Sequence, residues 1–332
     1  MSWQSELRER VAAGGPLPFP IAAVLSAAVP LQRLGMWWRL RGPRERLDAR
    51  VISFGNITAG GTGKTPAVIE RVERELASGR TVAVLTRGYG ARTQATSPIV
   101  LGGAEAASRW DLVGDEPALI ARRCPGAVIA RSADRVAAAR LAIERFACDT
   151  LILDDGYQYV RLERDDNFVV INASNPFGSG YLLPRGILRE PVSALTRATH
   201  VTLTHCDRAK DLEGTLEIIQ SHCPQVPVRK TRHAPENLWL VKDGAVLPLE
   251  QLRGESVTGV CAIGNPTGFR ATLVGLGAAV TELRTFRDHA EIPPEAFRAT
   301  GLVVTTEKDA VRLETAEENV LALRIALRDV DA

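Results

Sequence analysis

The segment Val51-Ile52-Ser53-Phe54-Gly55-Asn56-Ile57-Thr58-Ala59-Gly60-Gly61-Thr62-Gly63-Lys64-Thr65-Pro66 joins an apolar run to a glycine-rich turn, and an amphipathic segment follows it. A strand, a loop ending in Gly-Lys-Thr and a helix form the context that a phosphate-binding P-loop requires. Small residues let consecutive backbone N–H groups converge on a phosphate at a helix start, where the helix dipole favours negative charge. The segment therefore predicts an α/β fold built around a nucleotide site.

The expected nucleotide-binding positions are Thr58, Ala59, Gly60, Gly61, Thr62, Gly63, Lys64 and Thr65. Lys64 is expected to reach the β- and γ-phosphates of ATP, and the Thr65 hydroxyl to bind Mg²⁺. One position departs from the motif, because Thr58 stands where the pattern has glycine. The alternative is a glycine-rich turn with an incidental lysine, which the flanking strand and helix disfavour.

The composition bounds the class of protein. The 332 residues are enough for about two domains. The net charge of +2 is too balanced to indicate general nucleic-acid binding. Five cysteines without C-x-x-C spacing predict buried free thiols in a reducing compartment, with neither a disulfide framework nor a zinc site. No obligate protein partner is evident.

Residues 1–50 differ in character from the rest. Residues 17–34 are almost entirely apolar, but Pro20 and Pro30 are expected to limit an uninterrupted helix to about ten residues, too short to span a bilayer. Trp37, Trp38 and a cluster of arginines follow, a pattern typical of a segment in the membrane interface. The arginines are Arg39, Arg41, Arg44, Arg46 and Arg50. A helical hairpin packed on the protein's own core is the alternative. A cleaved signal peptide is disfavoured, because it would export the nucleotide loop away from ATP.

The rest of the chain predicts two α/β domains. Residues 51–206 are expected to form a P-loop core, a mostly parallel sheet with helices on both faces. Residues 91–110 are expected to be an exposed loop or hairpin. Residues 207–332 are expected to form a second, smaller α/β layer, with extended segments near 224–243 as a linker ribbon.

Several polar residues follow predicted strands, at the sheet edge where open α/β sheets bind ligands. Arg87 and Tyr89 lie in such a turn. Asp115 and Glu116 precede a proline at a helix start, where helix capping and a role as base or metal ligand are equally supported. Arg135 is basic near a helix start, which indicates an anionic ligand.

A second acidic site is expected after residues 150–153. Asp154 ends this apolar strand downstream of the P-loop, where P-loop enzymes hold Mg²⁺. Asp155 follows it, and two adjacent carboxylates repel unless a cation or proton intervenes. Gln158 and Tyr159 follow on a polar segment. His289, beside an aspartate at a strand end, is the best placed of the histidines for acid–base work, although a lone histidine is more often structural.

Taken together, these segments resemble the tetraacyldisaccharide 4'-kinase family from about residue 20 to 312. The resemblance rests on G-N-I-T-x-G-G-T-G-K-T-P (55–66), R-G-Y-G (87–90), V-G-D-E-P (113–117), D-D-G-x-Q (154–158), L-P-x-G-x-L-R-E-P (183–191), F-x-D-H (286–289) and T-x-K-D (306–309). Thr58 matches this family's pattern, which accounts for the departure from the general motif. Two other positions depart from the family, which usually has histidine where this chain has Tyr159 and Ala290.

The resemblance implies Mg²⁺-dependent transfer of phosphate from ATP to the 4'-hydroxyl of a tetraacylated glucosamine disaccharide 1-phosphate, the lipid A precursor. It implies a peripheral protein on the cytoplasmic face of the bacterial inner membrane, in contact with an anionic lipid surface. Asp115 matches the general base and His289 its orienting partner, with Lys64 as the third catalytic residue. The implied metal ligands are Thr65, Asp154, Glu116 and Asp155. The implied substrate-binding residues are Arg87, Tyr89, Arg135, Gln158, Tyr159 and Arg189.

Two other functions remain as alternatives. A P-loop NTPase acting as a switch or metallochaperone lacks a guanine-reading motif and a Cys/His cluster here. A membrane adaptor that only binds nucleotide is favoured by residues 17–46 alone.

Overall fold

The computed structural model describes residues 11, 18–288, 290–313 and 317–330. The chain divides into two compact units. The first comprises Met1–Arg87, Ser132–Arg232 and Leu327–Ala332, and the second Gly88–Arg131 and His233–Ala326. These units are interleaved along the chain, whereas the boundaries expected from the sequence, at 50/51 and 206/207, are consecutive. As a result, Asp115 belongs to the same unit as the C-terminal motifs.

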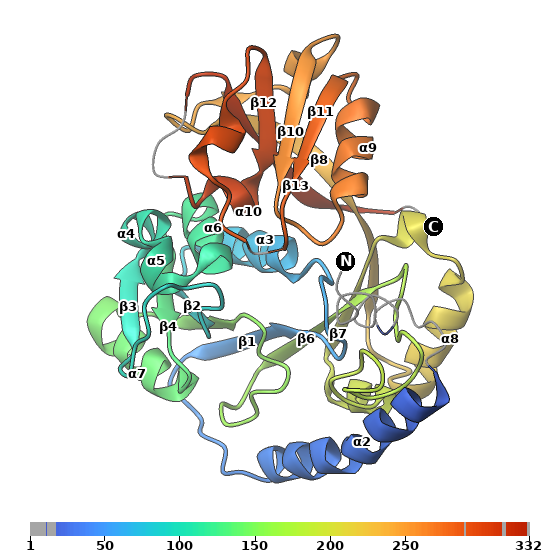
Figure 1. Cartoon of the computed structure of the whole chain (residues 1–332). Helices are drawn as coiled ribbons and strands as arrows, with labels where there is room; N and C mark the ends of the chain where they lie inside the picture. Colours follow the sequence, from blue (N-terminus) through green and yellow to red (C-terminus); the bar gives the residue numbers. More distant parts are fainter. Residues whose placement is uncertain (1–10, 12–17, 289, 314–316, 331–332) are drawn as a thin grey trace. The chain divides into compact units, whose positions relative to one another are not determined.

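The first unit contains a parallel sheet with the strand order β7-β6-β1-β5-β2. Figure 1 labels β1, β2, β6 and β7 of this sheet. The strands are β1 (Arg50–Gly55), β2 (Val82–Thr86), β5 (Thr150–Leu153), β6 (Asp166–Asn172) and β7 (His200–Thr204). The start of β8 (Val228–Leu240) pairs with β7, also in parallel. The strands are mostly buried, so they are near-continuous apolar runs, as parallel strands covered on both faces are. This confirms the predicted α/β class.

The helices of the first unit are α2 (Phe19–Leu40), α3 (Lys64–Ala77), α7 (Arg135–Phe146), α8 (Leu212–His222) and the 3₁₀ turns η1 (Val192–Arg197) and η2 (Cys206–Arg208). Two of them, α7 and α8, begin at aspartate side-chain caps. Asp134 caps α7 by accepting from the backbone N–H groups of Val136 and Ala137. Gly63 precedes α3 with φ 77°, a conformation that favours glycine. A buried apolar cluster that includes Ile57 and Val169 packs this unit together.

Helix α2 runs for 22 residues through Pro30, so the expected limit of about ten residues is wrong. Pro20 costs little, because the N–H groups of the first turn have no intrahelical partner. Pro30 removes one hydrogen bond, and its ring lies on an exposed part of the helix. By length and composition Phe19–Trp38 could cross a membrane, a test that a signal sequence near an N-terminus also passes. None of its most apolar stretch is buried, so the packed-hairpin alternative gains no support from α2.

The second unit contains a parallel sheet with the strand order β11-β10-β12-β13. Its strands are β10 (Ser256–Cys261), β11 (Ala279–Thr285), β12 (Leu302–Thr306) and β13 (Val320–Asp329), and β9 (Val246–Leu247) pairs with the end of β8. Its later helices are α9 (Pro266–Gly275), α10 (Glu307–Ala310), η3 (Leu249–Leu252) and η4 (Pro294–Phe297).

The chain around Asp115 forms the remaining part of the second unit. An antiparallel pair of strands, β3 (Ile99–Gly102) and β4 (Val128–Arg131), flanks the short helices α4 (Gly103–Ser108), α5 (Trp110–Val113) and α6 (Asp115–Arg123). Residues 91–110, expected to be an exposed loop or hairpin, therefore contain β3 and α4. Gly103 is buried, and a Cβ atom at this position would lie 2.6 Å from the carbonyl oxygen of Ala127, so only glycine fits here.

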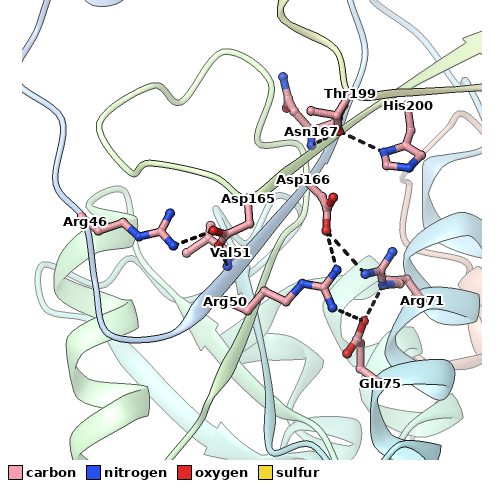
Figure 2. Close-up of polar contacts among 10 residues, drawn as sticks. All are labelled: Arg46, Arg50, Val51, Arg71, Glu75, Asp165, Asp166, Asn167, Thr199 and His200. Carbon is pink, nitrogen blue, oxygen red and sulfur yellow. Dashed lines mark hydrogen bonds and ion pairs between the residues drawn. The ribbon is translucent and has the colours of Figure 1, made fainter. Parts of the chain in front are cut away.

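Charged residues fasten the amino end of β1, opposite the P-loop (Figure 2). Arg50 lies 2.7 Å from Asp166 and 3.6 Å from Glu75 of α3. Arg46 lies 2.5 Å from Asp165, whose other carboxylate oxygen accepts the N–H of Val51 at 2.7 Å. Arg46 and Arg50 were expected to face anionic lipid, but both are paired with aspartates at the start of β6.

Candidate active site

The P-loop of the first unit begins in extended backbone. Thr58 is buried and forms an antiparallel bridge with Leu188, and the N–H of Ala59 donates to the carbonyl of Ile187 at 2.7 Å. Positive φ angles occur later in the loop, at Gly60 (107°) and Gly63 (77°). Threonine therefore replaces glycine at the first position of the motif without strain.

Lys64 is held in place by two side chains. Its Nζ lies 3.3 Å from Oδ1 of Asn56 and 3.4 Å from Oδ1 of Asp155. Asn56 is buried, and its amide also donates to the carbonyl of Thr58 at 2.6 Å. Asn56 thus orients the lysine and the loop together. Asn56 was not among the predicted site residues; its place between the apolar run 51–55 and the P-loop is the signal that could have found it.

Asp155 accepts two hydrogen bonds from Arg189, both at 2.9 Å. Burial acts to raise the pKa of the Asp155 carboxyl, but the charges of Lys64 and Arg189 outweigh it and hold that pKa below its ordinary value. Lys64 and Arg189 thus neutralise the charge of Asp155, which offsets the repulsion expected between Asp154 and Asp155. Arg189 reaches this place because its N–H donates to the carbonyl of Ile57 at 2.7 Å.

Asp154 and Thr65 offer the kind of ligands that Mg²⁺ prefers. Asp154 follows β5 directly, is 5% exposed, and its N–H donates to the carbonyl of Leu85 at 3.0 Å. A carboxylate and a hydroxyl on neighbouring elements fit Mg²⁺, which takes one or two protein oxygens and fills its remaining positions with water and phosphate. Among the described residues, no group of three or more His, Cys, Asp or Glu could hold a metal ion.

The buried hydroxyl of Thr62 hydrogen-bonds to no residue that the structure describes. The Thr62 carbonyl accepts from the hydroxyl of Thr204 at the end of β7, at 2.8 Å. The loop is thereby anchored through its backbone, while the Thr62 hydroxyl stays available to a phosphate oxygen.

Three of the expected substrate residues adjoin one another in the first unit. The Arg135 guanidinium lies 4.8 Å from the ring centre of Tyr159. The Tyr159 hydroxyl donates to Asp134 at 3.1 Å and accepts from the N–H of Val136 at 3.3 Å. Tyr159 thus reinforces the start of α7, which gives the tyrosine a structural role where the family usually has histidine. Gln158 donates to the carbonyl of Asn56 and to Glu190, both at 2.9 Å.

Asp115 is fully buried at the first residue of α6, in the second unit. One carboxylate oxygen accepts the N–H of Glu116 at 3.0 Å, and the other pairs with Arg312. Gly90 allows a close approach, since a side chain there would lie 2.8 Å from the Asp115 carboxylate. Sequence reasoning missed Arg312.

Residues from three motifs converge beside Asp115. Lys308 lies 3.5 Å from Glu116 and 3.8 Å from Asp288. Glu116 is therefore an ion-pair partner of Lys308 in this unit. His289, the expected partner of Asp115, lies outside the described residues. Of the remaining candidates, Arg87 and Tyr89 are exposed, Tyr89 at 59%.

Comparison with known proteins shows the family of the chain. A family model described as tetraacyldisaccharide-1-P 4'-kinase matches residues 17–331. The chain belongs to the tetraacyldisaccharide 4'-kinase family.

Relatives in this family match almost the whole chain. The tetraacyldisaccharide 4'-kinase of Anaeromyxobacter dehalogenans (strain 2CP-C) is 42% identical, over 96% of this chain and 86% of the relative. That of Pelobacter propionicus is 36% identical, over 94% and 91%. Among solved structures, LpxK from Aquifex aeolicus in complex with ATP is 27% identical with a TM-score of 0.73, covering 94% of this chain and 93% of that one.

Proposed function

We propose that the protein is an ATP-dependent kinase that phosphorylates the 4'-hydroxyl of a tetraacylated glucosamine disaccharide 1-phosphate in lipid A biosynthesis. Membership of the tetraacyldisaccharide 4'-kinase family over residues 17–331 carries this proposal. The P-loop supports it, because Lys64 and Thr62 are arranged to receive phosphate oxygens. ATP is the phosphoryl donor, in line with the ATP complex of the Aquifex aeolicus relative.

Residues of the first unit bind and activate ATP, the phosphoryl donor, in this proposal. Phosphoryl transfer is catalysed by positioning and by stabilising charge on the phosphate oxygens. The P-loop N–H groups and Lys64 supply that stabilisation, and Asp155 orients Lys64 at 3.4 Å. Asp154 and Thr65 would hold Mg²⁺, which neutralises charge on the β- and γ-phosphates when bound.

Asp115 is the proposed general base, which takes the proton of the acceptor hydroxyl. A carboxylate must accept the proton of the attacking hydroxyl, and Asp115 is buried and fixed by the N–H of Glu116. His289 follows Asp288, which lies 3.8 Å from Lys308 in the same unit as Asp115. Its assignment as the orienting partner rests on the family motif.

Helix α2 is the proposed binding element for the acyl chains and for the membrane. A hollow of about 330 Å³ lies between α2 and the loop that carries Arg189, and Gln32 of α2 donates to the Arg189 carbonyl at 2.9 Å. Apolar side chains such as Met36 and Leu182 line it together with Arg33, a mixture suited to a lipid with anionic groups. Exposed tryptophans on α2 suit the interface of an anionic membrane. On this proposal the protein is peripheral to the cytoplasmic face of the inner membrane.

Acceptor-dependent ADP release tests the proposal against a nucleotide switch or adaptor. Purified protein with ATP and Mg²⁺ should release ADP rapidly only when the lipid disaccharide is present. Asp115→Ala should lower kcat by at least about 100-fold, as loss of a general base does, with little change in ATP affinity. Lys64→Ala should weaken the use of ATP. ADP release that ignores the lipid would support the switch.

A further inference from the structure

Arg312 joins two segments of the second unit. One guanidinium nitrogen, Nη2, pairs with Oδ2 of Asp115, and Nη1 donates to the carbonyl oxygen of Ala290 at 3.0 Å. The side chain of Arg312 is 10% exposed and that of Asp115 is fully buried. A guanidinium presents its N–H donors in a rigid planar fork. One group therefore fixes the position of the Asp115 carboxylate relative to the backbone at Ala290.

Arg92 makes a second connection between the same two segments. It pairs with Glu291, the residue after Ala290, and its guanidinium lies 4.6 Å from the ring centre of Trp110. Arg312 lies 6.0 Å from the same ring. Residues 290–291 are thus tied to the segment 92–115 by two arginines that share one tryptophan.

We propose that Arg312 is a positioning residue for phosphoryl transfer, holding the Asp115 carboxylate at a set place relative to the chain at Ala290, which directly follows His289. The inference rests on the proposed role of Asp115 as general base. Arg312 acts through Asp115. Its second contact is to a backbone carbonyl, so it does not depend on the side chain at position 290, where the family usually has histidine.

The same ion pair has a rival interpretation, in which Arg312 keeps Asp115 away from the acceptor until it is released. The two interpretations predict opposite signs. If Arg312 positions Asp115, removing it lowers kcat, because a misplaced reacting group costs on the order of 100-fold. If Arg312 restrains Asp115, removing it raises kcat.

The test compares Arg312→Ala, Arg312→Gln and Arg312→Lys with the control Arg298→Ala. Arg298 lines the same hollow of about 380 Å³ but is exposed, and among the described contacts it reaches neither Asp115 nor Ala290. We expect Arg312→Ala and Arg312→Gln to lower kcat by about 100-fold, with KM for ATP and for lipid changed less than about threefold. Lysine should restore part of kcat, since an ammonium can reach one of the two acceptors. Arg298→Ala should match the wild type.

Chemical rescue separates positioning from a loss of stability. Because Arg312 lines an open hollow, guanidinium ion added at millimolar concentration can enter the space that Arg312→Ala leaves. We expect it to restore kcat of Arg312→Ala at least about tenfold and to leave Lys64→Ala unchanged; an unfolded variant would not be rescued, and its thermal transition would show it.

Asp115→Ala, measured alongside, keeps the two claims distinct. If Asp115→Ala is inactive while Arg312→Ala and Arg312→Gln retain or exceed wild-type kcat, the role of Arg312 is overturned and that of Asp115 stands. A variant of Arg312 that is slow but not rescued by guanidinium also overturns the positioning role. If Asp115→Ala retains wild-type kcat, the proposed base itself is wrong.

Discussion

At the scale of single residues, the donor site is a set of side chains that fix one another. Lys64 lies between Asn56 and Asp155, and Asp155 is in turn paired with Arg189. A lysine has a flexible stem, and these two partners hold its charge in place. Asn56 contributes to the P-loop through its contacts with Lys64 and with the carbonyl of Thr58.

Asn56→Ala should therefore raise KM for ATP. The substitution removes a hydrogen bond to a charged group, worth about 1.5–3 kcal/mol, which corresponds to about tenfold or more in affinity. Asn319→Ala is the matched control, because the amide of Asn319, like that of Asn56, donates to backbone carbonyls, here those of Ala299 and Gly301 in the second unit. Steady-state kinetics should show the KM increase in the first variant alone. Equal KM values would contradict the role given to Asn56.

The cysteines allow a second prediction at this scale. All five are free and buried, as the sequence predicted. Burial raises the pKa of Cys148 and of Cys261 to about 11, so their reactive thiolates are scarce at neutral pH and increase about tenfold for each unit of rising pH.

Labelling of the native protein with a thiol reagent at pH 7.5 should thus be about 100-fold slower than in denaturant, where all five cysteines react. The rate should rise with pH. Rapid stoichiometric labelling of the folded protein at pH 7.5 would contradict the burial of these thiols.

Candidate residues of the donor site could be named from the sequence because they are local to one motif or follow predicted strands, and their roles stay predictions. Thr58–Thr65 and Asp154 are of this kind. Arg312 could not be found in this way, because it meets Asp115 across a separation of 197 residues and no spacing rule relates the two. The predicted metal and substrate roles of Glu116, Gln158 and Tyr159 stay predictions, and each of these side chains already has a structural partner.

At the scale of elements, α2 and β13 show what local patterns miss. Proline in a sequence suggests a break, yet α2 continues through Pro30 because one lost hydrogen bond on an exposed face is tolerable. The strand β13 was not predicted at all. Charged residues interrupt its apolar pattern. It forms a strand by pairing in parallel with β12, a contact that no local sequence pattern indicates.

Helix α2 should anchor the protein to anionic vesicles. Leu31 is 73% exposed and Trp38 is 71% exposed, so replacing both by glutamate should not disturb the core. Each apolar side chain transferred to lipid contributes about 1.5–3 kcal/mol, so the double variant should bind vesicles at least about 100-fold more weakly. Val274→Glu, at a 51% exposed position on α9, is the control.

Co-sedimentation with vesicles of phosphatidylglycerol and phosphatidylethanolamine measures this binding. The variants should keep the thermal transition of the wild type. Unchanged vesicle binding in the Leu31→Glu, Trp38→Glu variant would contradict an interfacial role for α2, and an equal loss in Val274→Glu would show that the effect is not specific to this helix.

At the scale of the whole molecule, the chain order conceals the organisation. Segment 88–131 leaves the first unit and returns to it, and it brings Asp115 into the unit that holds Lys308 and Arg312. A boundary drawn by composition cannot foresee an excursion of this kind, since each segment is itself an ordinary α/β piece. The division assigns the donor residues to the first unit and the proposed base to the second.

The central claim is that the phosphate of ATP is transferred to one hydroxyl of a lipid disaccharide. The most direct measurement is the structure of the product formed from ATP, Mg²⁺ and tetraacyldisaccharide 1-phosphate, analysed by mass spectrometry and by ³¹P–¹H correlation. We predict a product heavier by one phosphate, with the new phosphorus coupled to the proton at the 4' position, and no such product from Asp115→Ala. An unmodified lipid, or phosphate at any other position, would contradict the account.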